Sequence, residues 1–187
     1  AAGMKHLGGL DIVVANAGIA GPTAAVEDVS YEDWRRCLGV NLDGAFLCAK
    51  HAAPHLKKQK SGSVILLSST AGLYGFPNRA PYCAAKWAIR GLTKTLAIEL
   101  GPHGVRANCI CPGAVEGARI DGVIERAAKA EGVSIAEMRE RSVRGSSLRA
   151  FMRPEDIANA ILFLTSPAGA KINGQEIAVD GHTEVLG

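Results

Sequence analysis

Apolar runs of strand length alternate with longer helical stretches along this chain of 187 residues. Four runs have the length and composition of buried strands, and they cover residues 10–15, 63–68, 105–111 and 174–179. Runs that stay apolar throughout are typical of strands covered on both faces. Strands that alternate with helices form a parallel sheet through right-handed crossovers. The sequence therefore predicts an α/β fold in which a doubly wound parallel sheet lies between two layers of helices.

The segments between these runs carry the start and stop signals of helices. Ser30, followed by Asp33, is typical of a helix N-cap with an acidic first turn. The helical pattern that follows continues to residue 60, with a break near Asn41. The longest predicted helix covers residues 80–100 and ends at Gly101 and Pro102. Shorter helices are predicted over residues 119–130, 134–144 and 154–164.

Composition argues against several classes of protein. A net charge of +3 without a long run of like charge argues against a nucleic-acid partner. We expect no membrane span and see no signal peptide. Five cysteines without a Cys-x-x-Cys pair are typical of reduced thiols, so we expect a cytoplasmic protein. Cys109 and Cys111 alternate along a predicted strand, which favours two side chains on one face over two metal ligands, and we expect no metal site.

Tyr82 and Lys86 are spaced i, i+4 on the longest predicted helix, so they lie on one face of it. An ammonium beside a phenol favours the phenolate, which can take a proton from an alcohol oxygen. Ser69 follows the second apolar run, where its hydroxyl could hold the same oxygen. An isolated Tyr-x-x-x-Lys pair is more often a half-buried tyrosine and a solvated lysine. The interpretation as an active site therefore depends on the surrounding motifs.

Several polar or glycine-containing motifs directly follow a predicted strand: Asn16-Ala17-Gly18, Ser69 and Pro112-Gly113. Ligands of parallel α/β sheets bind outside the carboxyl ends of the strands. We therefore expect these motifs to meet in one crevice, with the helix that carries Tyr82 and Lys86 as its long wall.

In their order along the chain, these motifs resemble those of the classical short-chain dehydrogenase/reductase family. The matching residues are Asn16-Ala17-Gly18, Asn41, Ser69, Tyr82 with Lys86, Pro112-Gly113 and the closing run from Ile172 to Gly181. The resemblance extends from about residue 10 to the C-terminus. It implies a Rossmann-like fold and an oxidoreductase that transfers a hydride between NAD or NADP and a small alcohol or ketone.

The resemblance also implies a role for each matched residue. Tyr82 would be the acid/base, Lys86 would assist it and bind the nicotinamide ribose, and Ser69 would polarise the substrate oxygen. Asn41 would hold a water that relays protons to Lys86, although it could also be a plain helix-kink residue. The residues expected to border the cofactor, besides Tyr82 and Lys86, are Asn16, Ala17, Gly18, Pro112, Gly113 and Val115.

Ser68 is a rival for the role of Ser69, because both hydroxyls stand at the end of the same predicted strand. The spacing from Ser69 to Tyr82 fits the family better. We therefore expect Ser68 to close the strand through a bond to the backbone.

The chain departs from the family pattern in three places. Ala15 stands where many relatives have an asparagine. Gly117 stands where a threonine often bonds the nicotinamide, which leaves that bond to Glu116 or to a backbone group. The glycine-rich turn that holds the cofactor pyrophosphate in classical members does not occur in the 187 residues. We therefore expect residues 1–187 to correspond to the C-terminal two-thirds of a single Rossmann domain, with its first strands missing.

Residues 114–150 form a long connection, which in the family covers the substrate. A connection of this length without its own structure is uncommon, so we expect a helical lid. Near its end four arginines occur with no acid between them: Arg141, Arg144, Arg149 and Arg153. They could bind an anionic substrate, but solvated or subunit-contacting arginines are the favoured interpretation.

Other functions and an assembly state also follow from the sequence. A relative that lost cofactor binding with its N-terminal third would be a non-catalytic binding or structural module. Epimerases and dehydratases of the extended branch share Tyr-x-x-x-Lys but have a larger C-terminal domain. A serine hydrolase is disfavoured because the chain has no Gly-x-Ser-x-Gly elbow. The helix over residues 80–100 is apolar on more than one face, and the resemblance places the second face between subunits of a homotetramer or homodimer.

Overall fold

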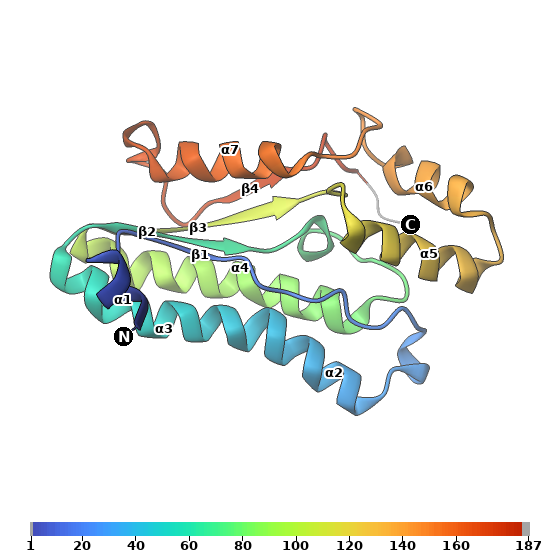
Figure 1. The fold of residues 1–187 in the computed structure, drawn as a ribbon, viewed down its shortest axis with the longest axis horizontal. Coiled ribbons are helices and arrows are strands. Elements are labelled where there is room, and N and C mark those ends of the chain that lie inside the picture. The colour runs from blue at the N-terminus through green and yellow to red at the C-terminus, as the bar shows by residue number, and fades with distance from the viewer. Residues whose placement is uncertain (1, 185–187) are drawn as a thin grey trace.

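The computed structural model describes residues 2–184, and these form a four-stranded parallel sheet with helices on both faces (Figure 1). The strands lie side by side in sequence order: β1 (Ile12–Ala15), β2 (Gly62–Leu67), β3 (Val105–Pro112) and β4 (Glu176–Val179). Helices α3 and α4 cover one face, and α7 covers the other. The predicted α/β architecture is confirmed.

The helices begin and end close to the predicted positions. They are α1 (Ala2–Leu7), α2 (Tyr31–Leu38), α3 (Gly44–Gln59), α4 (Ala80–Leu100), α5 (Ala118–Glu131), α6 (Ile135–Arg144) and α7 (Pro154–Thr165). The Ser30 side chain caps α2 by accepting from the Asp33 amide at 3.0 Å. The predicted break near Asn41 is a π-helical turn over Gly39–Asp43, which joins α2 to α3.

Alternating side chains of β2 divide the core into two layers. Val64 and Leu66 pack with Ile89 and Leu100 of α4, on the face that α3 also covers. Ile65 and Leu67 point the other way and pack against Leu164 of α7, together with Ile110 of β3. Because both faces of β2 are covered by helices, its core residues are apolar on both faces instead of alternating with polar ones.

Strand β1 differs from the prediction for its apolar run. It begins at Ile12 rather than at residue 10, and it is not buried on both faces. Ile12 and Val14 remain 47% and 41% exposed, whereas Val13 and Ala15 face the core. The reason is that α7 packs over β2 and β3 and leaves the same face of β1 uncovered in the described part of the chain.

Helices α5 and α6 form a separate pair beyond the carboxyl ends of the strands (Figure 1). They share a small core of Ile124, Ala128 and Met138. Arg139 of α6 forms an ion pair with Asp121 of α5 at 2.7 Å. The two predicted helices within residues 114–150 are thus present, and they stand at the end of the sheet where parallel α/β folds bind ligands.

Candidate active site

Helix α4 brings Tyr82 and Lys86 to the carboxyl end of β2. The helix begins directly after Arg79, and Pro81 in its first turn is compatible with the unpaired N–H groups there. Tyr82 is half-buried, and Lys86 is 3% exposed. The Lys86 Nζ lies 5.5 Å from the centroid of the Tyr82 ring and donates to the Leu67 carbonyl at 2.7 Å. The i, i+4 spacing therefore places both side chains on the face of α4 that is directed towards the carboxyl end of β2.

The surroundings of Lys86 make its charge costly. Burial lowers the pKa of the Lys86 ammonium to about 8, and the nearby Arg119 guanidinium acts in the same direction. A lysine of this kind is still charged at neutral pH, but it gives up its proton more readily than a lysine in water.

Ser68 and Ser69 have different environments at the end of β2. The Ser68 hydroxyl is buried and donates to the Lys86 carbonyl at 2.7 Å. The Ser69 hydroxyl is half-buried and accepts from the Ala71 amide at 3.2 Å, and its own proton goes to no residue in the described range. Ser68 thus bonds to the backbone as expected, and Ser69 keeps a donor available.

Asn41 lies in the π-helical turn and reaches the segment that follows β1. Its Nδ2 donates to the Cys37 carbonyl at 2.9 Å and to the Ile19 carbonyl at 3.0 Å. Its Oδ1 is buried and has no hydrogen-bond partner among residues 2–184. A Cβ on Gly18 would lie 2.6 Å from this oxygen and 3.8 Å from Lys86 Nζ, so only glycine lets the three residues approach each other. Asn41 is therefore both a residue of the kink and a neighbour of Lys86.

The remaining predicted residues surround the same end of the sheet. Asn16 and Ala17 follow β1 and are exposed. Pro112 is the last residue of β3, and the Gly113 amide donates to the Val179 carbonyl at 3.0 Å. Val115 pairs with Met152 in an isolated parallel bridge.

The backbone explains the glycine at position 117. Gly117 has a φ of 126° immediately before α5, a conformation that residues with a Cβ rarely adopt. A threonine here would require a different backbone. Glu116, the alternative partner, is exposed, and its backbone amide already donates to the Met152 carbonyl at 2.9 Å.

Two arginines that the sequence analysis did not identify lie over the Tyr82 ring. The guanidinium carbon of Arg79 is 4.9 Å from the ring centroid, and that of Arg119 is 5.9 Å from it. Arg79 is 4% exposed, whereas Arg119 is exposed at the start of α5. Arg79 stands three residues before Tyr82 among uncharged residues, and no periodic pattern distinguishes a buried arginine there from a solvated one.

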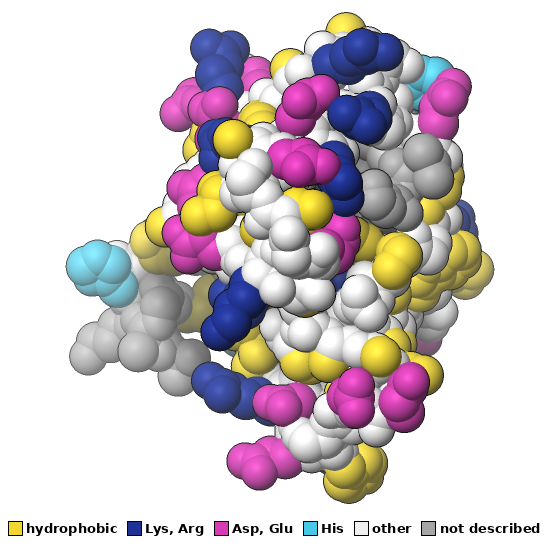
Figure 2. Space-filling view, turned by 90° about the vertical axis from the view of Figure 1, so that its right-hand side faces the viewer, with side chains coloured by type: hydrophobic (Ala, Val, Ile, Leu, Met, Phe, Trp, Pro, Cys, Tyr) yellow, Lys and Arg dark blue, Asp and Glu magenta, His cyan; other side chains and the backbone are white. Residues whose placement is uncertain are grey.

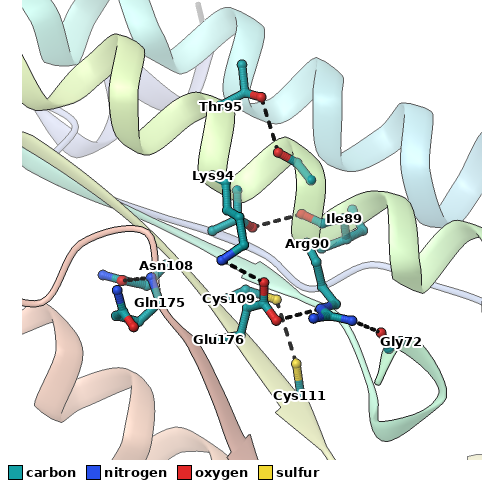
Figure 3. Close-up of polar contacts among 12 residues, drawn as sticks. Gly72, Ile89, Arg90, Lys94, Thr95, Asn108, Cys109, Cys111, Gln175 and Glu176 are labelled. Atoms are coloured by element: carbon teal, nitrogen blue, oxygen red, sulfur yellow. Dashed lines mark hydrogen bonds and ion pairs between the residues drawn. The ribbon is translucent and has the colours of Figure 1, made fainter. Parts of the chain in front are cut away.

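A third arginine fixes the turn that follows Ser69. Arg90 donates to the Gly72 carbonyl at 2.7 Å and to Glu176 of β4, which also pairs with Lys94 at 3.0 Å (Figure 3). Figure 3 shows Arg90 between Glu176 and the turn. Burial alone would raise the pKa of the Glu176 carboxyl, but the bonds from Lys94 and Arg90 outweigh it and hold the pKa below its usual 4.5. This cluster ties α4, β4 and the turn together beside the candidate site.

The arginines considered for an anionic substrate are mostly engaged elsewhere. Arg141 pairs with Glu131 and Glu137, Arg144 pairs with Glu140, and Arg153 pairs with Asp156. Arg149 has a φ of 47° and forms no ion pair within the described residues. Viewed from the end of the sheet near α5 and α6, basic and acidic side chains are intermixed (Figure 2). The structure therefore favours solvated, ion-paired arginines here.

The described residues hold no cluster of three or more His, Cys, Asp or Glu side chains arranged to bind a metal ion. Within the same range, every helix is too short or too polar to cross a membrane. Cys109 and Cys111 lie on one face of β3 with their sulfurs 4.0 Å apart, as their alternation predicted.

Comparison with known proteins identifies similar chains. The model of a family described as enoyl-(acyl carrier protein) reductase matches residues 1–182. Trans-4-hydroxycyclohexanecarboxylate dehydrogenase of Sinomonas cyclohexanicum is 38% identical over 96% of this chain, which spans 62% of that protein's length. NAD+-bound xylitol dehydrogenase superposes with a TM-score of 0.92 at 28% identity, over 96% of this chain and 71% of the other. The protein ElxO with NADP bound superposes with a TM-score of 0.83 at 27% identity, over 95% and 68%.

Proposed function

Because this chain belongs to the short-chain dehydrogenase/reductase family, we propose that it is an NAD- or NADP-dependent oxidoreductase that interconverts an alcohol and a ketone. The observation that carries the proposal is the placement of Tyr82 and buried Lys86 on one face of α4, at the end of the strand that Ser69 follows. Similar proteins with bound NAD+ or NADP support the choice of cofactor.

The residues around Lys86 fit the nicotinamide half of such a cofactor. An ammonium has three N–H donors, and the Leu67 carbonyl takes one of them, which leaves two for the hydroxyls of a ribose. The buried Oδ1 of Asn41 still needs a donor, and a water between it and Lys86 would provide one. A glycine-rich turn for the pyrophosphate does not occur in these 187 residues, so we assign no residue of this chain to the phosphates.

The proposed chemistry assigns one proton to Tyr82. A bound oxidised nicotinamide would supply the hydride acceptor for the alcohol carbon. The Tyr82 phenolate would take the proton of the alcohol hydroxyl. Ser69 donates its free proton to the same substrate oxygen and so orients it. Lys86 stabilises the phenolate and, through a water at Asn41, passes the proton towards solvent. Reduction of the ketone runs through the same groups in reverse.

We propose that the α5–α6 pair covers the substrate. Its separate core and the Arg139–Asp121 ion pair hold the two helices together as one unit. An open position would admit a small alcohol or ketone, and a closed one would exclude water from the transferring hydride.

The experiment that tests the function follows reduced nicotinamide by absorbance while the full-length protein is offered a panel of small secondary alcohols with NAD or NADP. We expect turnover with at least one alcohol and one cofactor. Cofactor binding without turnover across the panel would instead indicate a non-catalytic binding module.

A further inference from the structure

Arg79 is a second buried cation against the Tyr82 ring. Its guanidinium carbon is 4.9 Å from the ring centroid, closer than Lys86 Nζ at 5.5 Å. It is also buried to nearly the same extent, at 4% exposure against 3% for Lys86. Two buried cations thus contact the ring that carries the reacting oxygen.

Arg79 has no anionic partner that would account for its burial. No carboxylate in the described range lies within ion-pair distance of its guanidinium. Its Nη2 donates to the Ala20 carbonyl at 2.7 Å, and its Nε is buried without a partner. Buried charges in proteins are normally paired, because desolvation costs several kcal/mol per ion. The buried Arg79 guanidinium would be stabilised by a neighbouring group that can become negatively charged.

Tyr82 is that group. Burial lowers the pKa of the Arg79 guanidinium below its usual 12.5, and the largest opposing influence is the charge that Tyr82 can carry. A guanidinium 4.9 Å from the ring centroid is close enough for its positive charge to favour a negative charge on the same side chain. The guanidinium itself stays protonated across the working range of pH.

We propose that Arg79 is a positioning residue for Tyr82, which acts with Lys86 to stabilise the phenolate form that accepts the substrate proton. The proposal rests on the proposed function, because only an enzyme that uses this phenolate can report the effect. The bond to Ala20 and the stacking on Phe76, at 5.4 Å from the ring centroid, hold the guanidinium in place.

The other charged groups around Tyr82 do not oppose this assignment. Lys86 contributes from α4 and Arg119 from α5, and both are positive. Arg126 of α5 acts on Arg79 and is also positive. The thiols of Cys37 and Cys83 have pKa values raised by burial and stay neutral. Arg119 is exposed, so water and salt screen its charge more than that of Arg79.

Three variants of the full-length protein separate the effect of the Arg79 charge from the effect of its hydrogen bond to the Ala20 carbonyl. Arg79→Gln removes the charge and keeps a donor for the Ala20 carbonyl, Arg79→Lys keeps the charge, and Arg79→Met removes both. The readouts are kcat/KM for alcohol oxidation as a function of pH, cofactor affinity by titration calorimetry, and the melting temperature. Arg106→Met is a matched control, because Arg106 also donates to backbone carbonyls, those of Leu164 and Ile172, but on the far side of the sheet from Tyr82.

We expect Arg79→Gln and Arg79→Met to move the half-maximal point of oxidation upward by about one pH unit or more. Arg79→Lys should restore most of the wild-type pH profile of kcat/KM. Arg106→Met should lower the melting temperature but leave that pH profile unchanged. If Arg79→Gln keeps the wild-type profile, Arg79 is only a tether and the proposal is overturned. If Arg79→Met does not fold, the comparison of Gln with Lys decides the same question. A wild-type protein without turnover would refute the proposed function instead, so the two failures are distinct.

Discussion

At the residue scale, Lys86 shows that the candidate site is assembled at the expense of stability. Its ammonium is buried beside another cation, and its pKa falls to about 8 from 10.5. Between these pH values the unfolded chain binds more protons at this position than the folded chain does. The free energy of unfolding therefore rises with pH in that window, and below pH 8 the buried charge costs its full penalty.

Lys86→Met should therefore affect stability and activity in opposite directions. At pH 7 we expect the free energy of unfolding to rise by about 1–3 kcal/mol, since a buried charge is replaced by an apolar group of similar length. This gain should shrink as the pH rises from about 8 to 10.5. Oxidation should become slower and need a higher pH. Denaturant unfolding at several pH values checks the first part, and the exposed Lys58→Met should show no such dependence.

Sequence reasoning predicted Tyr82, Lys86, Ser69 and Asn41 because each lies in a recognisable local pattern. It did not predict Arg79, since the burial of this arginine depends on the Ala20 carbonyl, 59 positions away in sequence, and on the Tyr82 ring. The contact of Arg90 with Gly72 and Glu176 was missed for the same reason. Contacts between distant segments carry no periodic signal in one sequence.

At the element scale, helices with clear end signals were predicted best. Helix α4 has the predicted bounds, because Pro81 is compatible only with its first turn and Gly101-Pro102 cannot continue it. The burial of β1 was predicted wrongly, because an apolar run states which residues prefer to be covered but not which element covers them. The packing of α7 over β2 and β3 depends on tertiary contacts, which the local apolar pattern of residues 10–15 does not indicate.

The Glu176 cluster should give the joint between α4 and β4 a recognisable pH dependence. Because the folded pKa of Glu176 lies below 4.5, its contribution is complete above that pH and is lost as the pH falls through the folded value. We expect Glu176→Gln to lower the free energy of unfolding by about 2 kcal/mol at pH 7 and to approach the wild type in strong acid. Glu140→Gln, from an exposed pair with Arg144, should change it by less than about 0.5 kcal/mol. Equal effects of the two variants would contradict this account of the joint.

At the scale of the whole molecule, α3 and α4 leave apolar side chains uncovered. Phe46 and Leu47 of α3 are each 46% exposed, and Trp87 and Ile98 of α4 are 47% and 77% exposed. A groove between the two helices is lined by Phe46, Leu92 and Leu96. Exposed apolar side chains gathered on two neighbouring helices are typical of association sites. We propose that a second copy of the chain packs on this face in a homodimer or homotetramer.

Ile98→Glu tests that assembly. The side chain is mostly exposed in one copy, so the substitution should leave the fold of the protomer intact. In an oligomer built on this face it would bury a charge without a partner, and light scattering at micromolar concentration should then show a smaller species than the wild type. Leu148→Glu, at a side chain that is 70% exposed but lies outside α3 and α4, should keep the wild-type mass. A monomeric wild type would contradict the proposed assembly.

The central claim is that Tyr82 carries the proton of the proposed reaction, and one substitution tests it most directly. Tyr82→Phe keeps the ring against Arg79 and Lys86 and removes only the hydroxyl. Measured in the full-length protein, kcat should fall by about a hundredfold or more while titration calorimetry shows cofactor affinity within a few-fold of the wild type. Retention of more than about a tenth of the wild-type kcat, with cofactor still bound, would contradict the claim.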